Sequence, residues 1–170
     1  MFKPLLILLL LSTALPSWSR GTYQKPADFL SETFQQNVPK AQVIWLSGEV
    51  RDTATEILTH KPRSLRVRYW ANEDKSVWVL NEIGKTEPIT VGFVIRDNKI
   101  TLVKVLIFRE SRGSEIRHDF FTRQFNNTKL TQNNKLDRHI DGITGATLSV
   151  RALTRLSQLA LYLNRQRLKK

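Results

Sequence analysis

The residues best suited to chemistry stand together late in the chain, immediately before a long run with helical periodicity. They are Asp141-Gly142-Ile143-Thr144-Gly145-Ala146-Thr147. Glycines allow backbone dihedrals and close approaches that a Cβ atom would block, and aspartate and threonine are residue types that cap helices. The segment is therefore predicted to be a loop that enters a helix.

The residues after this loop, 148–163, have the period of an amphipathic helix. At about 100° per residue, their apolar side chains fall on one stripe that would face a core. The stripe consists of Leu148, Ala152, Leu156, Leu159 and Leu163, flanked by Leu153 and Ala160. Thr147 falls away from the centre of this stripe, so we expect its hydroxyl to be accessible.

The start of this helix suits an anion. Backbone amides of a first helical turn lack intrahelical partners, and the helix dipole adds roughly half a positive charge there. Helical side chains lean toward the N-terminus, so Arg151 is expected to point back toward a group on Thr147. From these residues alone, two interpretations are open: a site that carries a phosphate, or an ordinary helix cap with small residues packed beneath it.

Residues 141–147 resemble the flavinylation motif of the FMN-binding domain family, written Asp-x-x-Ser/Thr-Gly-Ala-Thr. That family includes the FMN-bearing subunits of Rnf-type complexes and of the sodium-pumping NADH:quinone reductase. In the family a flavin transferase moves FMN from FAD onto the last threonine through a phosphoester. By position, the resemblance implies that Thr147 carries FMN covalently. The residues expected to present it to the transferase are Asp141, Gly142, Thr144, Gly145 and Ala146.

A second segment, Glu110-Ser111-Arg112-Gly113, resembles the Glu-x-x-Gly stretch that the same family carries after its central hairpin. The resemblance covers roughly residues 77–163. It implies that Gly113 lets backbone approach the flavin and that Arg109 or Arg112 lies near the pyrimidine edge, where a cation stabilises the anionic reduced flavin. The alternative is that both arginines are solvated loop residues. Glu110 is counted with this cofactor-binding set.

Composition narrows the choice of cofactors. The chain has no cysteine, which excludes disulfides, cysteine-attached haem and thiolate-bound clusters or zinc. The three histidines, at positions 60, 118 and 139, have no spacing typical of a shared metal site. An organic cofactor is therefore the expected carrier of electrons, and no nucleophile triad or phosphate loop indicates a catalytic residue.

The N-terminus has the pattern of a secretory signal. Lys3 precedes an apolar run over 5–15, and small residues at Ser17 and Ser19 would fit cleavage after Ser19. The run is shorter than the roughly twenty residues that span a bilayer. We therefore expect an exported, periplasmic protein, with an uncleaved anchor as the alternative.

The formal charge of +12 would ordinarily suggest nucleic acid, but an exported protein meets little of it. We expect the basic surface to serve an acidic redox partner, the flavin phosphate or peripheral contact with anionic lipid. A merely solvated surface is the alternative.

The remaining patterns predict an α+β fold built on an antiparallel sheet. Strands are expected over 88–96 and 99–109, joined at Asp97-Asn98, residue types that tolerate the positive φ of a tight hairpin turn. This central hairpin, 88–109, would be packed by the C-terminal helix over 147–166. Further strands are expected over 65–70 and 77–83, and residues 42–46 are expected to form a short strand or a packed turn. Short helices are expected over 23–37, 52–60 and 118–125. One domain is expected, made of a signal peptide (1–19), an N-terminal segment (20–76), an FMN-binding core (77–166) and a basic tail (167–170).

Some side chains are assigned to the core in advance. On the hairpin strands, one face is expected to hold Ile89, Val91, Phe93 and Ile95, and the partner face Val103, Val105 and Ile107. The helix over 118–125 is expected to be anchored by Phe120, Phe121 and Phe125. Core positions are also expected for Trp45, Trp70 and Trp78.

These patterns together predict an exported electron-transfer flavoprotein. It would carry electrons from a quinone- or NADH-linked membrane donor to an extracytoplasmic acceptor, and it would be the substrate of a flavin transferase rather than a stand-alone catalyst. Two alternatives stay open. One is a small reductase that binds FMN noncovalently, and the other is a basic secreted binding module without redox activity.

Overall fold

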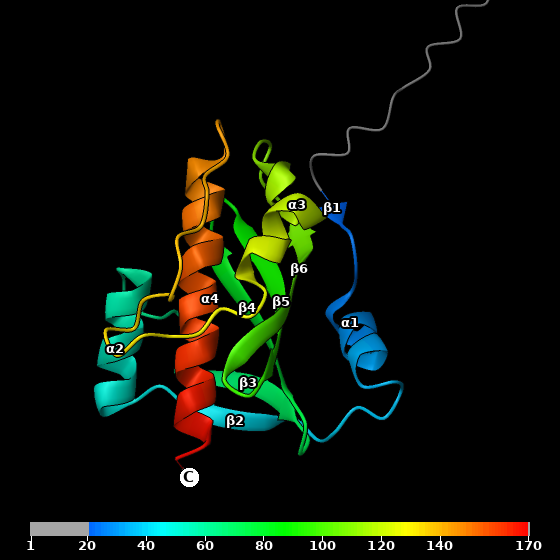
Figure 1. The fold of residues 1–170 in the computed structure, drawn as a ribbon, viewed down its shortest axis with the longest axis vertical. Helices are drawn as coiled ribbons and strands as arrows, with labels where there is room; N and C mark the ends of the chain where they lie inside the picture. Colours follow the sequence, from blue (N-terminus) through cyan, green and yellow to red (C-terminus); the bar gives the residue numbers. More distant parts are fainter. Residues whose placement is uncertain (1–20, 170) are drawn as a thin grey trace, which may run out of the picture.

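The computed structural model describes residues 21–169, so the expected signal peptide and its cleavage site lie outside the described residues. The fold is α+β, as predicted, with one antiparallel sheet in the order β1-β6-β5-β4-β3-β2 (Figure 1). The strands are β1 Gly21–Thr22, β2 Gln42–Trp45, β3 Arg66–Ala71, β4 Ser76–Ile83, β5 Pro88–Arg96 and β6 Lys99–Phe108.

Helices cover both faces of this sheet. They are α1 Pro26–Thr33, α2 Gly48–Leu58, α3 Asp119–Thr122 and α4 Thr147–Arg167, with short 3-10 helices η1 Ser114–Arg117 and η2 Arg123–Phe125. In Figure 1, α4 runs along one face of the sheet with α2 beside it, and α1 lies on the other side. No helix within residues 21–169 combines the length and the hydropathy needed to cross a bilayer.

The central hairpin forms as the sequence predicts. Asp97 and Asn98 have φ values of 48° and 57° and close a turn in which Arg96 pairs with Lys99. The inward face of β5 is fully covered, because Ile89, Val91 and Phe93 are all 0% exposed. The hairpin therefore forms the centre of the main core, against α4.

The prediction that Ile107 shares a face with Val103 and Val105 is wrong. Val91 pairs with Val105 but Thr90 pairs with Ile107, so Leu106 is an extra residue in β6. Such a bulge interrupts the alternation of side chains along a strand. Ile107 consequently packs in the cluster on the α1 side of the sheet, and Phe108 joins the main core instead.

A second, smaller core lies between the sheet and α1. Its buried members are Phe29, Leu30, Phe34, Val77, Val94 and Leu106. The ring of Phe29 rests on the backbone of Gly92, since a Cβ atom built on Gly92 would lie 2.4 Å from the Phe29 Cε1 atom. The absence of a side chain at position 92 thus lets α1 sit close to β5.

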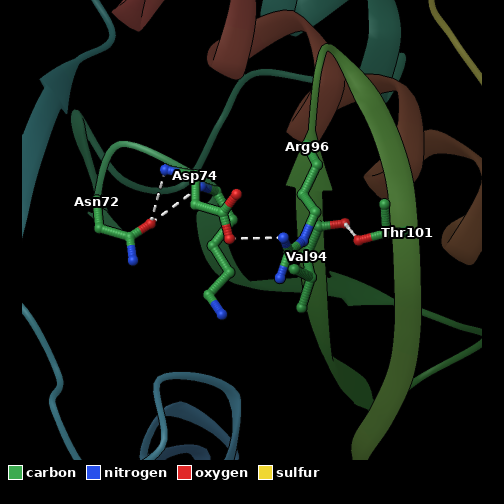
Figure 2. Close-up of polar contacts among 6 residues, drawn as sticks. Asn72, Asp74, Val94, Arg96 and Thr101 are labelled. Atoms are coloured by element: carbon green, nitrogen blue, oxygen red, sulfur yellow. Dashed lines mark hydrogen bonds and ion pairs between the residues drawn. The ribbon is translucent and has the colours of Figure 1, made fainter.

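Polar contacts join the β3–β4 turn to the β5–β6 hairpin near its turn at residues 97–98, as Figure 2 shows. The Asn72 Oδ1 atom accepts hydrogen bonds from the backbone N–H groups of Asp74 and Lys75, at 3.1 and 3.0 Å. Arg96 donates from Nη1 to the Asp74 carboxylate at 2.5 Å. The Thr101 hydroxyl donates to the Val94 carbonyl at 3.2 Å, where the pairing shifts register. The turn and the hairpin end are thereby held together.

Three apolar side chains expected in the core are exposed: Trp45 at 58%, Phe120 at 65% and Leu148 at 44%. Trp45 follows the buried Ile44 on the outermost strand, so alternation turns its side chain outward. The helix α3 is one turn long and buries Phe121, leaving Phe120 on its outer side. Leu148 lies in the first turn of α4, before the buried run begins at Ser149. Trp78 is 0% exposed, as predicted.

Candidate flavin-attachment site

The loop over 141–146 leads directly into α4, whose first residue is Thr147. Neither Asp141 nor Thr144 caps the helix, because the N-cap residue is Ala146 and no side-chain oxygen bonds the first turn. The loop closes instead through a turn, in which the Ala146 N–H donates to the Ile143 carbonyl at 3.0 Å, with Gly145 at φ +84°. Small residues therefore replace the expected polar cap.

This geometry leaves the first amides of α4 without protein partners. The Val150 N–H makes the first bond of the helix, to the Ala146 carbonyl at 3.0 Å. Within residues 21–169, no acceptor is bonded to the backbone N–H groups of Thr147, Leu148 or Ser149. Such amides, at the positive end of a 21-residue helix, are donors suited to a phosphate.

The side chains around these amides have the exposure that the sequence predicts for an attachment site. Thr147 is exposed, as expected for an accessible hydroxyl, and Arg151 is exposed one turn further along α4. Ala146 and Ser149, which flank Thr147 on the inner side, are 3% and 4% exposed. The exposed Thr147 side chain thus lies beside a packed base.

The two segments that carry the family resemblance are in contact. Gly113 has φ +86°, and a Cβ atom built there would lie 2.8 Å from the Ser149 Oγ atom and 3.3 Å from the Ala146 Cβ atom. The loop over 110–113 is therefore packed against the first turn of α4. Ser149 was not singled out in the sequence, because nothing in a linear pattern indicates which residue of α4 faces Gly113.

Glu110 belongs to this loop, but its carboxylate faces the turn between β4 and β5. Its Oε1 atom accepts hydrogen bonds from the backbone N–H groups of Lys85, Thr86 and Glu87, the last two at 2.7 and 2.9 Å. Burial of the carboxylate raises its pKa. The backbone bonds, together with one from the Thr86 hydroxyl at 3.2 Å, outweigh burial, so the pKa of Glu110 is lowered overall. Glu110 therefore anchors the base of the loop to the sheet.

The two arginines expected near the flavin have different environments. Arg109 donates from Nη1 to the Pro88 carbonyl at 3.1 Å and to the Thr90 hydroxyl at 3.3 Å, so it lies along β5. Arg112 is exposed in the loop beside Gly113. Of the two, Arg112 has the more accessible side chain.

The first part of the motif is an open loop. Asp141, Gly142, Thr144 and Gly145 are all exposed, and a Cβ atom on either glycine would meet no atom within 4 Å. The Asp141 backbone N–H donates to the Gln124 side chain at 2.7 Å. This loop leaves space in which a modifying enzyme could approach Thr147.

A groove in the described part of the chain lies elsewhere. It has a volume of about 640 Å³ and lies between β3 and β4, and none of the motif residues lines it. Residues 21–169 contain no group of three histidine, aspartate or glutamate side chains placed to hold a metal ion. The motif site is thus an exposed helix end rather than a closed pocket.

An FMN phosphate fits this helix end. The helix end offers an exposed threonine side chain, three amides with no partner among residues 21–169, and an exposed arginine one turn away. These are the groups that a phosphoester would require. The residues beneath, Gly113, Ala146 and Ser149, are packed and small.

Comparison with known proteins bears on the cofactor. No curated protein and no solved structure matches the chain. Residues 84–162 match the family model described as the FMN-binding domain, and this range contains both the Glu110–Gly113 segment and the motif ending at Thr147. FMN is therefore supported as the cofactor. The part of the chain over 84–162 is therefore similar to the FMN-binding domain family.

Proposed function

We propose that this protein is an exported electron-transfer flavoprotein whose FMN is joined to Thr147 by a phosphoester. One observation carries the proposal: the last threonine of the motif is the first residue of α4, and its side chain is exposed. Among residues 21–169, no acceptor is bonded to the surrounding amides. An ordinary cap would have used a side-chain oxygen to bond those amides. Here no side chain caps the helix, so these amides remain available to bond a ligand.

The attachment step requires a separate enzyme. A threonine hydroxyl ionises far above neutral pH and does not attack a pyrophosphate unaided, so the transferase must supply the base and any metal. The Thr147 Oγ atom attacks the FMN phosphorus of FAD. A P–O bond to threonine forms, the pyrophosphate P–O bond breaks, AMP leaves, and the threonine proton passes to the transferase base.

The residues of this chain then bind and orient the phosphate. The amides of Thr147, Leu148 and Ser149 donate toward it, and Arg151 supplies a compensating charge. The exposed loop over 141–145 is where the transferase would bind, because its glycines leave space around the hydroxyl. Larger side chains at Gly145 or Ala146 would obstruct that approach.

Covalent attachment suits a carrier outside the cytoplasm. Bound FMN supplies one- and two-electron chemistry that no protein side chain offers, and a phosphoester keeps cofactor and protein together at any dilution. The proposed donor is a quinone- or NADH-linked membrane complex, and the proposed acceptor is extracytoplasmic. The secretory pattern at residues 1–19 supports a periplasmic location.

Mass spectrometry of the intact protein tests the attachment. The whole chain is coexpressed with a flavin transferase, and three forms are weighed: the unaltered chain, Thr147→Ala, and Thr154→Ala as a control on the same helix. We expect the FMN mass on the unaltered chain and on the control but not on Thr147→Ala, together with flavin fluorescence of the denatured protein on a gel.

Other outcomes would select a different function. Flavin that leaves the protein on denaturation would support a reductase with noncovalent FMN. A folded, colourless protein that binds anionic vesicles, with binding that weakens steeply as salt is added, would support a basic binding module instead. A folded and exported chain without added mass, in cells that flavinylate other proteins, would refute the attachment.

A further inference from the structure

The sheet opens between β3 and β4. The two strands pair at three positions only, Tyr69 with Trp78, Trp70 with Val77 and Ala71 with Ser76. Beyond Tyr69, β3 stays with β2, and β4 continues beside β5 to Ile83. Within the described chain, no backbone hydrogen bond joins 79–83 to 66–68. Two strand edges therefore face an opening inside the sheet rather than at its outer border.

A groove of about 640 Å³ occupies this opening. One wall is β4 from Val79 to Ile83, and the other is β3 from Arg66 to Arg68, continued by residues 62–64. Its apolar lining includes Leu46, Leu58, Leu80 and Leu159. The volume is in the range of sites that bind ligands of several hundred daltons or short peptide segments.

The open edge of β4 offers backbone groups to whatever enters. Alternate residues of an antiparallel strand direct their N–H and C=O groups to opposite sides. On the side that faces β3, residues 79–83 pair with no strand within the described chain. Backbone groups shielded from water without partners are costly. An unpaired strand edge is accordingly a template for pairing with another extended chain.

The charge of the groove lining indicates which kind of extended segment it would bind. Arg63, Arg66 and Arg68 are exposed at its wall, and none forms an ion pair with an acidic group within residues 21–169. The acidic residue in the lining is Glu82, which is 7% exposed and bonded to the His60 Nε2 atom at 2.8 Å. The accessible charge is therefore positive.

We propose that this groove binds an extended acidic segment of a partner protein, which pairs with β4 as an added strand. Residues 79–83 would pair with about five residues, at roughly 3.3 Å of rise each. Because side chains alternate along a strand, the bound segment would place apolar side chains against the leucine lining and acidic ones toward the arginines. The proposal does not depend on flavin at Thr147, which does not line the groove.

Selection from a displayed library of random eight-residue peptides tests the proposal, with the whole chain as the target. We expect the enriched peptides to alternate acidic and apolar residues. A synthetic copy of one such peptide should then slow hydrogen exchange at backbone amides of residues 79–83. N-methylation of the peptide at alternate residues should abolish binding in one register and spare it in the other.

Charge reversal supplies the matched variants. Arg66→Glu combined with Arg68→Glu should weaken peptide binding about tenfold or more and reduce its salt dependence. Lys129→Glu, an exposed site outside the groove lining, should leave the affinity unchanged. Circular dichroism confirms that both variants fold.

The proposal is overturned by any of three results. The first is a selection that enriches no peptide above the starting library. The second is a bound peptide that protects amides elsewhere and not at 79–83. The third is evidence that the arginines are a general basic surface, seen either as an equal loss of affinity in Lys129→Glu or as binding of anionic vesicles in place of peptides.

Discussion

Gly113 faces Ser149 so closely that a Cβ atom on residue 113 would lie 2.8 Å from the Ser149 Oγ atom. The two residues belong to the two segments that carry the family resemblance, and their contact joins the loop after the hairpin to the first turn of α4. Glu110 fixes the other end of that loop to the β4–β5 turn. A chain of contacts therefore links the sheet to the start of α4, where Thr147 lies. Glu110 bonds the β4–β5 turn, and Gly113, in the same loop, packs against Ser149.

Replacing Gly113 by alanine should destabilise the protein by about 1–3 kcal/mol. Two causes add: a left-handed φ that alanine tolerates poorly, and the contact with Ser149. Gly145→Ala provides the comparison, because Gly145 has almost the same φ, +84° against +86°, but nothing within 4 Å of its added Cβ atom. Urea unfolding of both variants should therefore show the larger loss at position 113.

A double variant isolates the contact. Gly113→Ala combined with Ser149→Ala should recover part of the loss, since the Oγ atom nearest the new Cβ atom is removed. The backbone strain would remain. Equal losses for Gly113→Ala and Gly145→Ala, with no recovery in the double variant, would show that φ alone sets the cost.

Glu110→Gln should lower the free energy of unfolding by about 1–3 kcal/mol at neutral pH, the usual value of hydrogen bonds to a charged acceptor. The variant replaces a carboxylate that accepts three backbone N–H bonds with a neutral amide. Glu115→Gln, at an exposed position in η1, is the control and should change stability little. Denaturant unfolding of the three proteins measures the difference.

The same substitution predicts a pH dependence with a definite sign. Because the pKa of Glu110 is lowered in the folded protein, its contribution is full above the ordinary carboxyl pKa and is lost as pH falls through the folded value. The stability difference between the unaltered chain and Glu110→Gln should therefore shrink as the solution is acidified below about pH 4.5. A difference that grows on acidification would contradict the assignment.

Local patterns predicted much of this structure. Period-two alternation and the Asp97-Asn98 turn located the hairpin, and the leucine stripe located α4 to within one residue at each end. Each of these patterns involves only a few neighbouring residues, so the local structure that it predicts depends little on the rest of the fold. The motif likewise identified which threonine begins the helix, because its spacing is a linear property.

Other features depend on contacts that no local pattern encodes. The extra residue at Leu106 reverses the faces of β6 only through its pairing with β5. The opening between β3 and β4 depends on strand pairing, because β3 continues beside β2 to Arg66 while β4 continues beside β5 to Ile83. Glu110 is placed in the cofactor-binding set by its position in the Glu-x-x-Gly segment, and that role stays a prediction. Its hydrogen bonds go to residues 85–87, more than twenty positions earlier, which no local pattern indicates.

His60 should titrate above its ordinary pKa. The hydrogen bond from its Nε2 atom to Glu82, and then that from Nδ1 to the Lys61 carbonyl, stabilise the charged ring and raise the pKa of His60. Glu82→Gln should lower that pKa toward 6.5, its ordinary value. The ring proton signals of His60, followed by NMR against pH in the unaltered chain and in Glu82→Gln, measure the change.

The sign of the stability effect follows from the raised pKa of His60. The contribution of the His60–Glu82 pair is full below the ordinary histidine pKa and is lost as pH rises through the folded value. Since the His60 side chain is 41% exposed, the effect should amount to a few tenths of a kcal/mol. Stability of the unaltered chain relative to Glu82→Gln should fall across neutral pH, and a rise there would contradict the pairing.

Gly92→Ala should disturb the core between α1 and the sheet without affecting the proposed flavin site at Thr147. The added Cβ atom would lie 2.4 Å from the Phe29 Cε1 atom and 2.6 Å from its Cζ atom, and Phe29 is 1% exposed, so α1 must move away from the sheet. We expect a loss of about 1–3 kcal/mol on unfolding. Gly21→Ala, where nothing lies within 4 Å, is the control.

Combining Gly92→Ala with Phe29→Leu should cost less than the sum of the two single changes, by about 0.5–3 kcal/mol, because the smaller side chain relieves the overlap. Additive losses would mean that α1 shifts as a whole instead. Attachment of FMN at Thr147 should persist in every one of these variants, because Phe29 packs on the face of the sheet opposite α4. Loss of flavin from a folded Gly92→Ala protein would show that the two faces are coupled through β5.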